Sequence, residues 1–206
     1  MSVADNRIYL ASRSPRRREL LKQIGVSFES LLVREDLRRG VDVDETPLAE
    51  ESAGIYALRI ARSKAAIALQ QIAQRGLPQK PVLAADTTIV FDDRIIGKPE
   101  DDQHAMRLLR ALSGREHQVL TAVALALKDQ VETQISVSSV WFREISDAEI
   151  RRYVASGEAH DKAGAYAIQG RAAAFTMRIE GSYSGIMGLP LAETAELLQR
   201  FNIPVL

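Results

Sequence analysis

Cysteine is absent from this chain of 206 residues, which excludes disulfide bonds, zinc–thiolate centres and thiol nucleophiles. Long apolar runs are missing too, since none approaches the roughly 20 residues that span a bilayer. The first ten residues, MSVADNRIYL, lack the basic and then apolar pattern of a signal peptide. Neither charge is in excess, because 27 basic residues balance 27 acidic ones, whereas nucleic-acid binders usually show a basic excess. We therefore expect a cytoplasmic protein with no membrane and no nucleic-acid partner.

Several familiar catalytic motifs are also missing. The segment Gly97-Lys98-Pro99 lacks the upstream glycine and the hydroxyl residue of a Walker-type phosphate loop. In GSYSG, Tyr183 stands where a nucleophile elbow needs serine. The three histidines, at positions 104, 117 and 160, are scattered, and none has a metal-ligand partner at helical spacing. Walker-type NTPases and Ser-His-Asp hydrolases are therefore disfavoured.

Apolar β-rich segments alternate with amphipathic ones, which favours an α/β protein with a mixed twisted sheet and flanking helices. The expected strands are 7–11, 26–33, 82–92, 95–96, 119–127, 131–142 and 172–180. The expected helices are 15–24, 48–75, 102–112, 150–155 and 191–201, with a glycine-rich turn over GSYSGIMGLP. No linker or repeat divides the chain, so we expect a single domain over residues 1–206. Two lobes around a cleft are compatible with this pattern.

The segment LASRSPRRREL places a basic cluster directly after the first expected strand. Ser14 can cap the following helix, and a helix N-terminus binds anions through its free N–H groups. Arg16 and Arg17 add forked donors that suit phosphate oxygens. Solvated arginines are the alternative, but positive charge in a first helical turn opposes the helix dipole. We therefore favour a phosphate-binding loop, and we assign no role to Arg18.

Two groups of carboxylates are candidates for chemistry. Asp86 lies in AADTTIV, among small and β-branched residues, where an aspartate is costly to bury unless it is paired or bound to metal. It could be a general base or a ligand of a hard cation, and a turn aspartate is the alternative. Asp42, Asp44 and Glu45 are closely spaced and suggest Mg²⁺ shared with substrate phosphates. On spacing alone, a solvated acidic loop explains these three residues better.

Two lysines and one polar loop complete the candidates. Lys64 lies inside a long expected helix, where a lone lysine usually faces solvent, whereas Gly97 and Pro99 fix the backbone around Lys98. In DKAGAYAIQG, the Gln169 amide offers a donor and an acceptor that suit the edge of a base, and Tyr166 could stack or pack. An ordinary glycine loop is equally compatible with that segment. Together the candidates describe a nucleotide hydrolase better than a binding module.

Seven segments, taken in order, resemble the Maf family of nucleoside triphosphate pyrophosphatases over nearly the whole chain. They are LASRSPRRREL, VDET, RIARSKA, VLAADTTIV, GKPEDDQHAMRLLRALSGREHQVLTAVAL, DKAGAYAIQG and GSYSGIMGLPL. Two positions depart from the family pattern: Arg13 stands where glycine is common, and Gly185 stands where asparagine is frequent. The form AGAYAIQG resembles the dTTP/UTP branch, because the 7-methyl-GTP branch tends to carry Glu-Gly in place of Gln169-Gly170.

The resemblance implies hydrolysis of a nucleoside triphosphate to a monophosphate and pyrophosphate with a divalent metal, Mg²⁺ or alternatively Mn²⁺ or Co²⁺. It also implies the fold of inosine triphosphate pyrophosphatases, two lobes around a deep cleft, and a homodimer. Asp86 would be the catalytic proton acceptor and, with Glu45, a metal ligand. The positions that would govern substrate choice are Arg16, Thr87 and Gln169. The phosphate-binding positions would be Ser12, Ser14, Arg17, Lys64 and Lys98.

The mechanism that follows is a hypothesis in which Asp86 deprotonates or orients a water that attacks the α-phosphorus. Two alternatives stay open. One is a non-catalytic nucleotide-binding regulator of septum formation, which has no need of a buried acid. The other is a housecleaning pyrophosphatase for inosine or xanthosine triphosphate, which Gln169 beside Tyr166 disfavours by analogy. The physiological substrate could also be a modified pyrimidine nucleotide.

Overall fold

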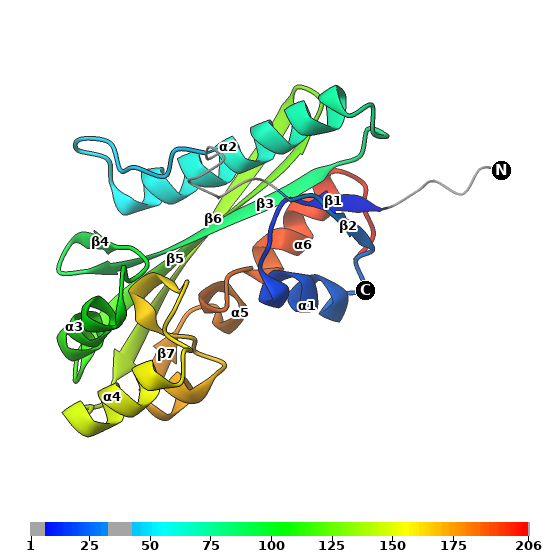
Figure 1. Cartoon of the computed structure of the whole chain (residues 1–206). Helices are drawn as coiled ribbons and strands as arrows, with labels where there is room; N and C mark the ends of the chain where they lie inside the picture. Colours follow the sequence, from blue (N-terminus) through cyan, green and yellow to red (C-terminus); the bar gives the residue numbers. More distant parts are fainter. Residues whose placement is uncertain (1–6, 33–42, 206) are drawn as a thin grey trace. The chain divides into compact units, whose positions relative to one another are not determined.

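A computed structural model describes residues 7–32 and 43–205 as a mixed sheet with flanking helices (Figure 1). The strands are β1 Ile8–Leu10, β2 Phe28–Ser30, β3 Val82–Phe91, β4 Arg94–Ile96, β5 Glu116–Leu127, β6 Gln130–Phe142 and β7 Thr176–Glu180. The helices are α1 Pro15–Gln23, α2 Ala53–Gln74, α3 Asp102–Leu112, α4 Asp147–Ala155, α5 Tyr183–Ile186 and α6 Leu191–Arg200, with 3₁₀ turns η1 Ala163–Ala165 and η2 Arg171–Ala174. The predicted mixed α/β class is confirmed. Within these residues, no helix combines the length and the apolar character that a membrane crossing requires.

The strand order is β2-β1-β3-β5-β6-β7, and β4 pairs with β3 outside this path. Strand β1 is parallel to both β2 and β3, with Leu10 opposite Leu83, whereas β4 and β7 pair antiparallel to their neighbours. The loop that leaves β1 continues along β3, because the Ala11 N–H donates to the Leu83 carbonyl at 2.8 Å. The expected phosphate loop therefore starts beside the part of β3 that leads to Asp86.

The chain divides into two compact units. The first unit contains the residues up to Asp86 together with 121–135 and 188–206, and the second contains 87–120 and 136–187. Strands β3, β5 and β6 each contribute residues to both units. A single domain over residues 1–206 and a cleft between two lobes stay predictions.

In the first unit, helix α2 covers one face of the sheet, and α1 and α6 cover the other (Figure 1). The inner face of α2 is rich in alanine: Ala57, Ala61, Ala65 and Ala68 are fully buried. Small side chains let the helix backbone approach the strands closely. Lys64 belongs to the same buried face and is only 9% exposed, so its ammonium is held close to the sheet.

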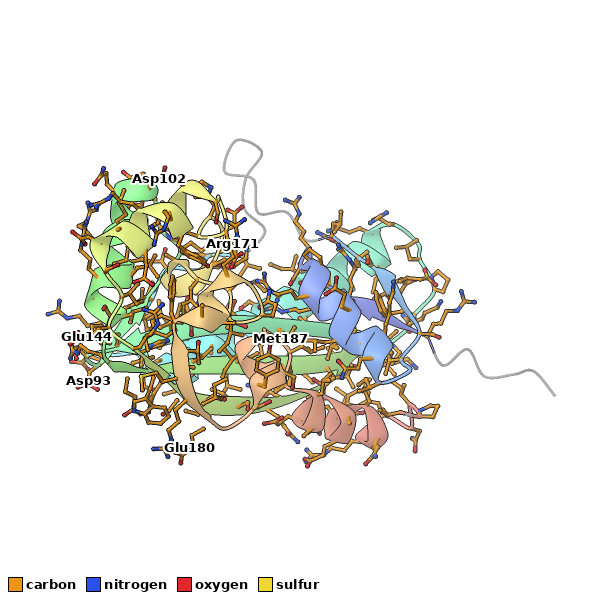
Figure 2. The ribbon with its side chains drawn as sticks, turned by 90° about the horizontal axis from the view of Figure 1, so that it is seen from below. Asp93, Asp102, Glu144, Arg171, Glu180 and Met187 are labelled. Carbon is orange, nitrogen blue, oxygen red and sulfur yellow. The ribbon has the colours of Figure 1, made fainter. Side chains whose placement is uncertain are left out.

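The second unit is built around an aromatic core. Phe142 makes edge-to-face contacts with His117, Tyr166 and Phe175, at ring-centroid distances of 4.9, 4.9 and 6.2 Å. Helices α3 and α4 pack side by side against this core (Figure 1). Charged side chains of this unit point outward into solvent, as Figure 2 shows for Asp93, Asp102, Glu144 and Glu180.

Four segments differ in type or extent from the elements expected there, besides smaller shifts of element ends. The long helix begins at Ala53 and not at 48, because Ser52 caps it by accepting the Ile55 N–H. The strand expected over 26–33 is reduced to Phe28–Ser30 in the described residues. The first part of the strand expected over 172–180 forms η2, and GSYSG contains the short helix α5. The bounds of α3 agree with the prediction. Helix α4 begins at Asp147, three residues before the expected start, behind a capping box of Ser146 and Glu149.

Candidate active site

The loop after β1 is held together by its own hydroxyl groups. Ser14 caps α1, and its Oγ accepts the Arg17 N–H at 3.4 Å. Ser12 is 8% exposed, and its Oγ accepts the Ser14 N–H at 3.2 Å and Arg17 Nη1 at 3.3 Å. The predicted helix start at Ser14 is confirmed. The two serines therefore fix the loop, and Arg17 in the first turn of α1 lies beside β3.

Arg17 ties this loop to two other parts of the first unit. Its Nη1 donates to the Ala85 carbonyl on β3 at 2.8 Å, and its Nε donates to the Gly188 carbonyl at 2.6 Å. Ala85 directly precedes Asp86, so the Arg17 guanidinium binds the backbone one residue before the buried acid. These contacts add a clamping role that the sequence did not reveal. Phosphate binding by Arg17 stays a prediction.

In the first unit, Lys64 lies between two carboxylates. Lys64 Nζ lies 2.8 Å from Asp86 Oδ1 and 2.7 Å from Glu45 Oε1. The side chains of Asp86 and Lys64 are 10% and 11% exposed, and that of Glu45 is 38% exposed. Burial opposes the charge on Lys64, but the carboxylates of Asp86 and Glu45 outweigh it, and the pKa of Lys64 is raised. Lys64 therefore carries a positive charge at neutral pH and does not face solvent as a lone helix lysine usually does.

Six predicted residues thus form two bonded groups in the first unit, one in the loop and one around Lys64. They are Ser12, Ser14, Arg17, Glu45, Lys64 and Asp86. The link between the loop and the acid runs through the Ala85 carbonyl. Arg16 lies half-buried in the first turn of α1, and its role in substrate choice stays a prediction.

The other three predicted residues belong to the second unit. Thr87 follows Asp86 in β3, so its side chain points to the opposite face of the sheet. Lys98 is exposed in its turn. The neighbouring Gly97 carbonyl accepts the Gly164 N–H at 3.1 Å. This bond joins the GKP turn to the DKAGAYAIQG loop, so two segments that the sequence analysis selected separately form one structural element.

Gln169 is exposed on a loop whose backbone is held by hydrogen bonds to Glu158 and Tyr153. Glu158 Oε1 accepts the Tyr153 hydroxyl at 3.1 Å and the Arg171 N–H at 2.9 Å. The Tyr153 hydroxyl in turn accepts the Ala167 N–H at 3.2 Å. The backbone is therefore held on both sides of Gln169, which leaves the amide side chain at the surface of this loop.

Tyr166 packs in the core and does not offer its ring for stacking. It is 6% exposed, and its hydroxyl lies 2.8 Å from His117 Nε2. Burial lowers the pKa of His117 to about 4 and raises that of Tyr166 above its usual value. Of the two roles considered for Tyr166, stacking and packing, the structure therefore shows packing. Tyr166 and His117 are both neutral at pH 7.

Known proteins resemble this chain over nearly its whole length. The family model described as "Maf-like protein" matches residues 7–201. The chain belongs to the Maf-like protein family. It is 59% identical over 205 residues to a dTTP/UTP pyrophosphatase of Nitrosomonas europaea, covering 100% of this chain and 99% of the relative. A dTTP/UTP pyrophosphatase of Nitrosospira multiformis is 56% identical with the same coverage. A solved HAM1 protein from Coxiella burnetii is 18% identical with a TM-score of 0.47, over 94% of this chain and 98% of that chain.

A divalent cation can be tested against the donors that this Maf-like protein offers. Within residues 7–32 and 43–205, no group of three or more His, Cys, Asp or Glu side chains could hold a metal ion. Glu45 and Asp86 nevertheless converge on one ammonium, and both supply hard oxygen donors. Mg²⁺ usually takes one or two carboxylates plus phosphates and water. The pair fits a cation shared with a triphosphate better than an all-protein cage.

Among the described residues, the remaining acidic candidate, Asp44, is not paired with Glu45 or Asp86. Asp44 Oδ1 accepts the Thr46 N–H at 2.9 Å, and hydrogen bonds from Thr46 lower the pKa of its carboxyl. Its carboxylate is therefore turned into its own loop. Asp42 lies outside the described residues.

A separate cavity of about 740 Å³ at the C-terminal end of α2 is lined in part by Leu69, Ile72 and Leu127, and by none of the predicted site residues.

Three residues around Glu45 escaped the sequence analysis: Glu51, Tyr56 and Arg59. Tyr56 donates its hydroxyl to the Glu45 carbonyl, and Arg59 pairs with Glu51. Arg59 begins the segment RIARSKA, which also contains Lys64 and is one of the seven segments of the family resemblance. That resemblance was the one sequence feature that could have pointed to Arg59. The eight-residue separation of Glu51 and Arg59 matches no helical pair rule, because Glu51 precedes the helix.

Proposed function

We propose that this Maf-like protein hydrolyses dTTP and UTP between the α- and β-phosphates, giving the nucleoside monophosphate and pyrophosphate. The observation that supports this proposal is the ammonium of Lys64 between Asp86 and Glu45, next to a phosphate-type loop at the N-terminus of α1. A helix N-terminus binds phosphate groups, and a fixed positive charge stabilises the charge that develops during phosphoryl transfer. The names of the relatives give the substrate class.

The proposed reaction is a water attack on the α-phosphorus. The water oxygen forms a bond to phosphorus, the bond to the bridging oxygen breaks, and pyrophosphate leaves with the bonding electrons. Asp86 accepts the proton of the water. Lys64 Nζ lies 2.8 Å from Asp86 Oδ1 and orients the carboxylate before the attack. Arg16, Arg17 and Lys98 stabilise the charge that grows on the leaving pyrophosphate.

A divalent cation belongs to this proposal. Glu45 and Asp86 would hold it together with the substrate phosphates, with Mg²⁺ as the first choice and Mn²⁺ or Co²⁺ as alternatives. The ion supplies charge neutralisation and orientation of the triphosphate when it is bound. Thr87, Gln169 and Arg16 select the nucleotide, with the Gln169 amide reading the edge of the base. The working form is a cytoplasmic homodimer.

The test is a panel of triphosphates with Mg²⁺, in which pyrophosphate and orthophosphate are measured separately. The panel contains dTTP, UTP, inosine triphosphate and 7-methyl-GTP. Pyrophosphate from dTTP and UTP is the expected result. Faster turnover of inosine triphosphate would favour the housecleaning alternative. Orthophosphate alone, or binding without turnover, would reject the proposal, and the second of these outcomes describes the non-catalytic regulator.

The substitution Asp86→Asn tests the proton acceptor. An amide keeps the size of the side chain but cannot accept a proton, so kcat should fall by roughly 10²–10⁴-fold. Binding of a non-hydrolysable dTTP analogue and the circular dichroism spectrum should show that the variant is folded. Turnover close to that of the wild type would remove Asp86 from the proposed mechanism.

A further inference from the structure

The loop that carries Glu45 is fixed at three backbone positions. The Tyr56 hydroxyl donates to the Glu45 carbonyl at 3.0 Å. Arg59 Nη2 donates to the Thr46 carbonyl at 3.0 Å, and Glu51 Oε2 accepts the Leu48 N–H at 3.1 Å. Residues 45–48 belong to no helix or strand, so these side-chain contacts take the place of a regular backbone pattern. We call Glu51, Tyr56 and Arg59 the loop clamp.

The members of the loop clamp hold one another in a defined geometry. Arg59 Nε and Nη2 lie 2.6 and 2.7 Å from the two oxygens of Glu51, which is a bidentate pair. The Glu51 side chain is only 4% exposed. The Arg59 guanidinium also lies 5.5 Å from the centre of the Tyr56 ring. A planar, forked cation is needed for all of these contacts together, and lysine cannot supply it.

The protonation states of the clamp are also fixed at neutral pH. The hydrogen bond from Arg59 lowers the pKa of Glu51, so this carboxyl is ionised. Burial and the nearby charges of Asp86 and Glu45 raise the pKa of Tyr56 to about 12. The Tyr56 hydroxyl is the donor in its bond to Glu45, because a backbone carbonyl can only accept.

Helix α2 connects the loop clamp to the candidate active site. Tyr56 and Arg59 lie in its N-terminal half, and Lys64 follows five residues after Arg59. Glu45 meets this helix twice: its carbonyl binds Tyr56, and its carboxylate binds Lys64. With the backbone held at positions 45, 46 and 48, the carboxylate is directed toward Lys64 and Asp86.

We propose that Arg59 is a positioning residue: together with Glu51 and Tyr56, it aims the Glu45 carboxylate at Lys64 and at the cation shared with the substrate. The contacts of the loop clamp are observed in the structure, whereas their effect on the reaction rests on the proposed function. Residues that orient a metal ligand typically change metal affinity by about 10–100-fold when they are replaced. We therefore expect Arg59 to act on the cation dependence of the reaction through Glu45.

A double-mutant cycle separates positioning from general stability. The variants are Arg59→Gln, Glu45→Gln and the double variant, with dTTP hydrolysis measured over a titration of Mg²⁺. Arg59→Gln should raise the Mg²⁺ concentration at half-maximal activity by about 10-fold, with KM for dTTP at saturating Mg²⁺ changed less than about 2-fold. In the Glu45→Gln background the same change should have no further effect, because residues that act as a unit are not additive. Full additivity would overturn the proposal.

Arg62→Gln is the matched control, because Arg62 lies on the same helix three residues further and is exposed. It should leave the Mg²⁺ dependence unchanged. Tyr56→Phe removes a single hydroxyl and should raise the Mg²⁺ requirement in the same direction as Arg59→Gln. If Arg59→Gln unfolds the chain, this second variant carries the test, and a wild-type Mg²⁺ requirement in Tyr56→Phe would contradict the proposal.

Hydrogen exchange tests the clamp independently of activity. In Arg59→Gln, amides in the segment 43–51 should exchange faster than in the wild type, while α6 should be unchanged. Unchanged exchange in this segment would overturn the positioning role even if the enzyme is active. A wild-type protein that releases no pyrophosphate from any triphosphate would instead reject the proposed function, and the exchange experiment would still decide the role of Arg59.

Discussion

Lys64 is the residue whose ammonium pairs with both carboxylates of the candidate site, Glu45 and Asp86. Replacing Lys64 with methionine would leave Asp86 buried without its partner. Breaking a buried ion pair from one side costs roughly 3–5 kcal/mol. We expect a loss of stability of about that size in urea unfolding. Lys98→Met, at an exposed lysine, should change it by less than about 0.5 kcal/mol, and equal effects of the two variants would contradict the assigned pair.

His117 makes stability depend on pH. Burial lowers its pKa to about 4 in the folded protein, whereas an unfolded histidine titrates near 6.5. The unfolded chain therefore binds more protons between these values, and the free energy of unfolding falls as the pH drops through this window. From pH 7 to 5.5 the loss from His117 should be about 1 kcal/mol. Urea unfolding at the two values should show this loss in the wild type, and His117→Gln should lack it; the same loss in both proteins would speak against the buried neutral histidine.

Single residues differ in how much their sequence context revealed. The surroundings of Asp86 are apolar along the chain itself, so its burial and its need for a partner followed from AADTTIV. Tyr166 gave no such signal, because its partner His117 is 49 residues away. Two partners of the Arg17 guanidinium are backbone carbonyls, those of Ala85 and Gly188. Every residue has a carbonyl, so no residue type marks such an acceptor.

Helix ends were predictable where the signal for them is local in the sequence. Ser14 and the Ser146–Glu149 capping box mark helix starts by side chains within one turn. The start of α2 was misplaced because residues 48–51 continue the apolar and acidic composition of a helix. The Arg59–Glu51 pair and the Ser52 cap hold this segment outside it. The segment 171–174 forms η2 and not a strand, with the Arg171 N–H bound to Glu158 (Arg171 is labelled in Figure 2).

The loop around Gln169 depends on a missing side chain at Gly170. A Cβ at this position would lie 2.1 Å from Glu158 Oε1. Gly170→Ala should therefore displace the Glu158 carboxylate from the Arg171 N–H and free the backbone beside Gln169. We expect KM for UTP to rise several-fold with kcat nearly unchanged. Gly97→Ala is the steric control, since nothing lies within 4 Å of a Cβ there, and its thermal stability should match that of the wild type. Unaltered UTP kinetics in Gly170→Ala would argue against a selecting role for this loop.

At the scale of the whole molecule, the candidate site is assembled from segments that no spacing rule connects. Lys64 and Asp86 are 22 residues apart, and Arg17 and Gly188 are 171 apart. Composition excluded thiol chemistry, and the alternation of elements indicated the fold class. The joint role of these segments came from their order along the chain, which is the family pattern. The contacts inside the site needed the folded arrangement, because packing of α1 and α2 against β3 brings the groups together.

The position of water attack tests the central claim most directly. The reaction is run with dTTP and Mg²⁺ in water enriched in ¹⁸O, and both products are analysed by mass spectrometry. If Asp86 activates a water that attacks the α-phosphorus, one ¹⁸O atom appears in the thymidine monophosphate and none in the pyrophosphate. Label in the pyrophosphate, or release of labelled orthophosphate, would place the attack on another phosphorus and contradict this mechanism.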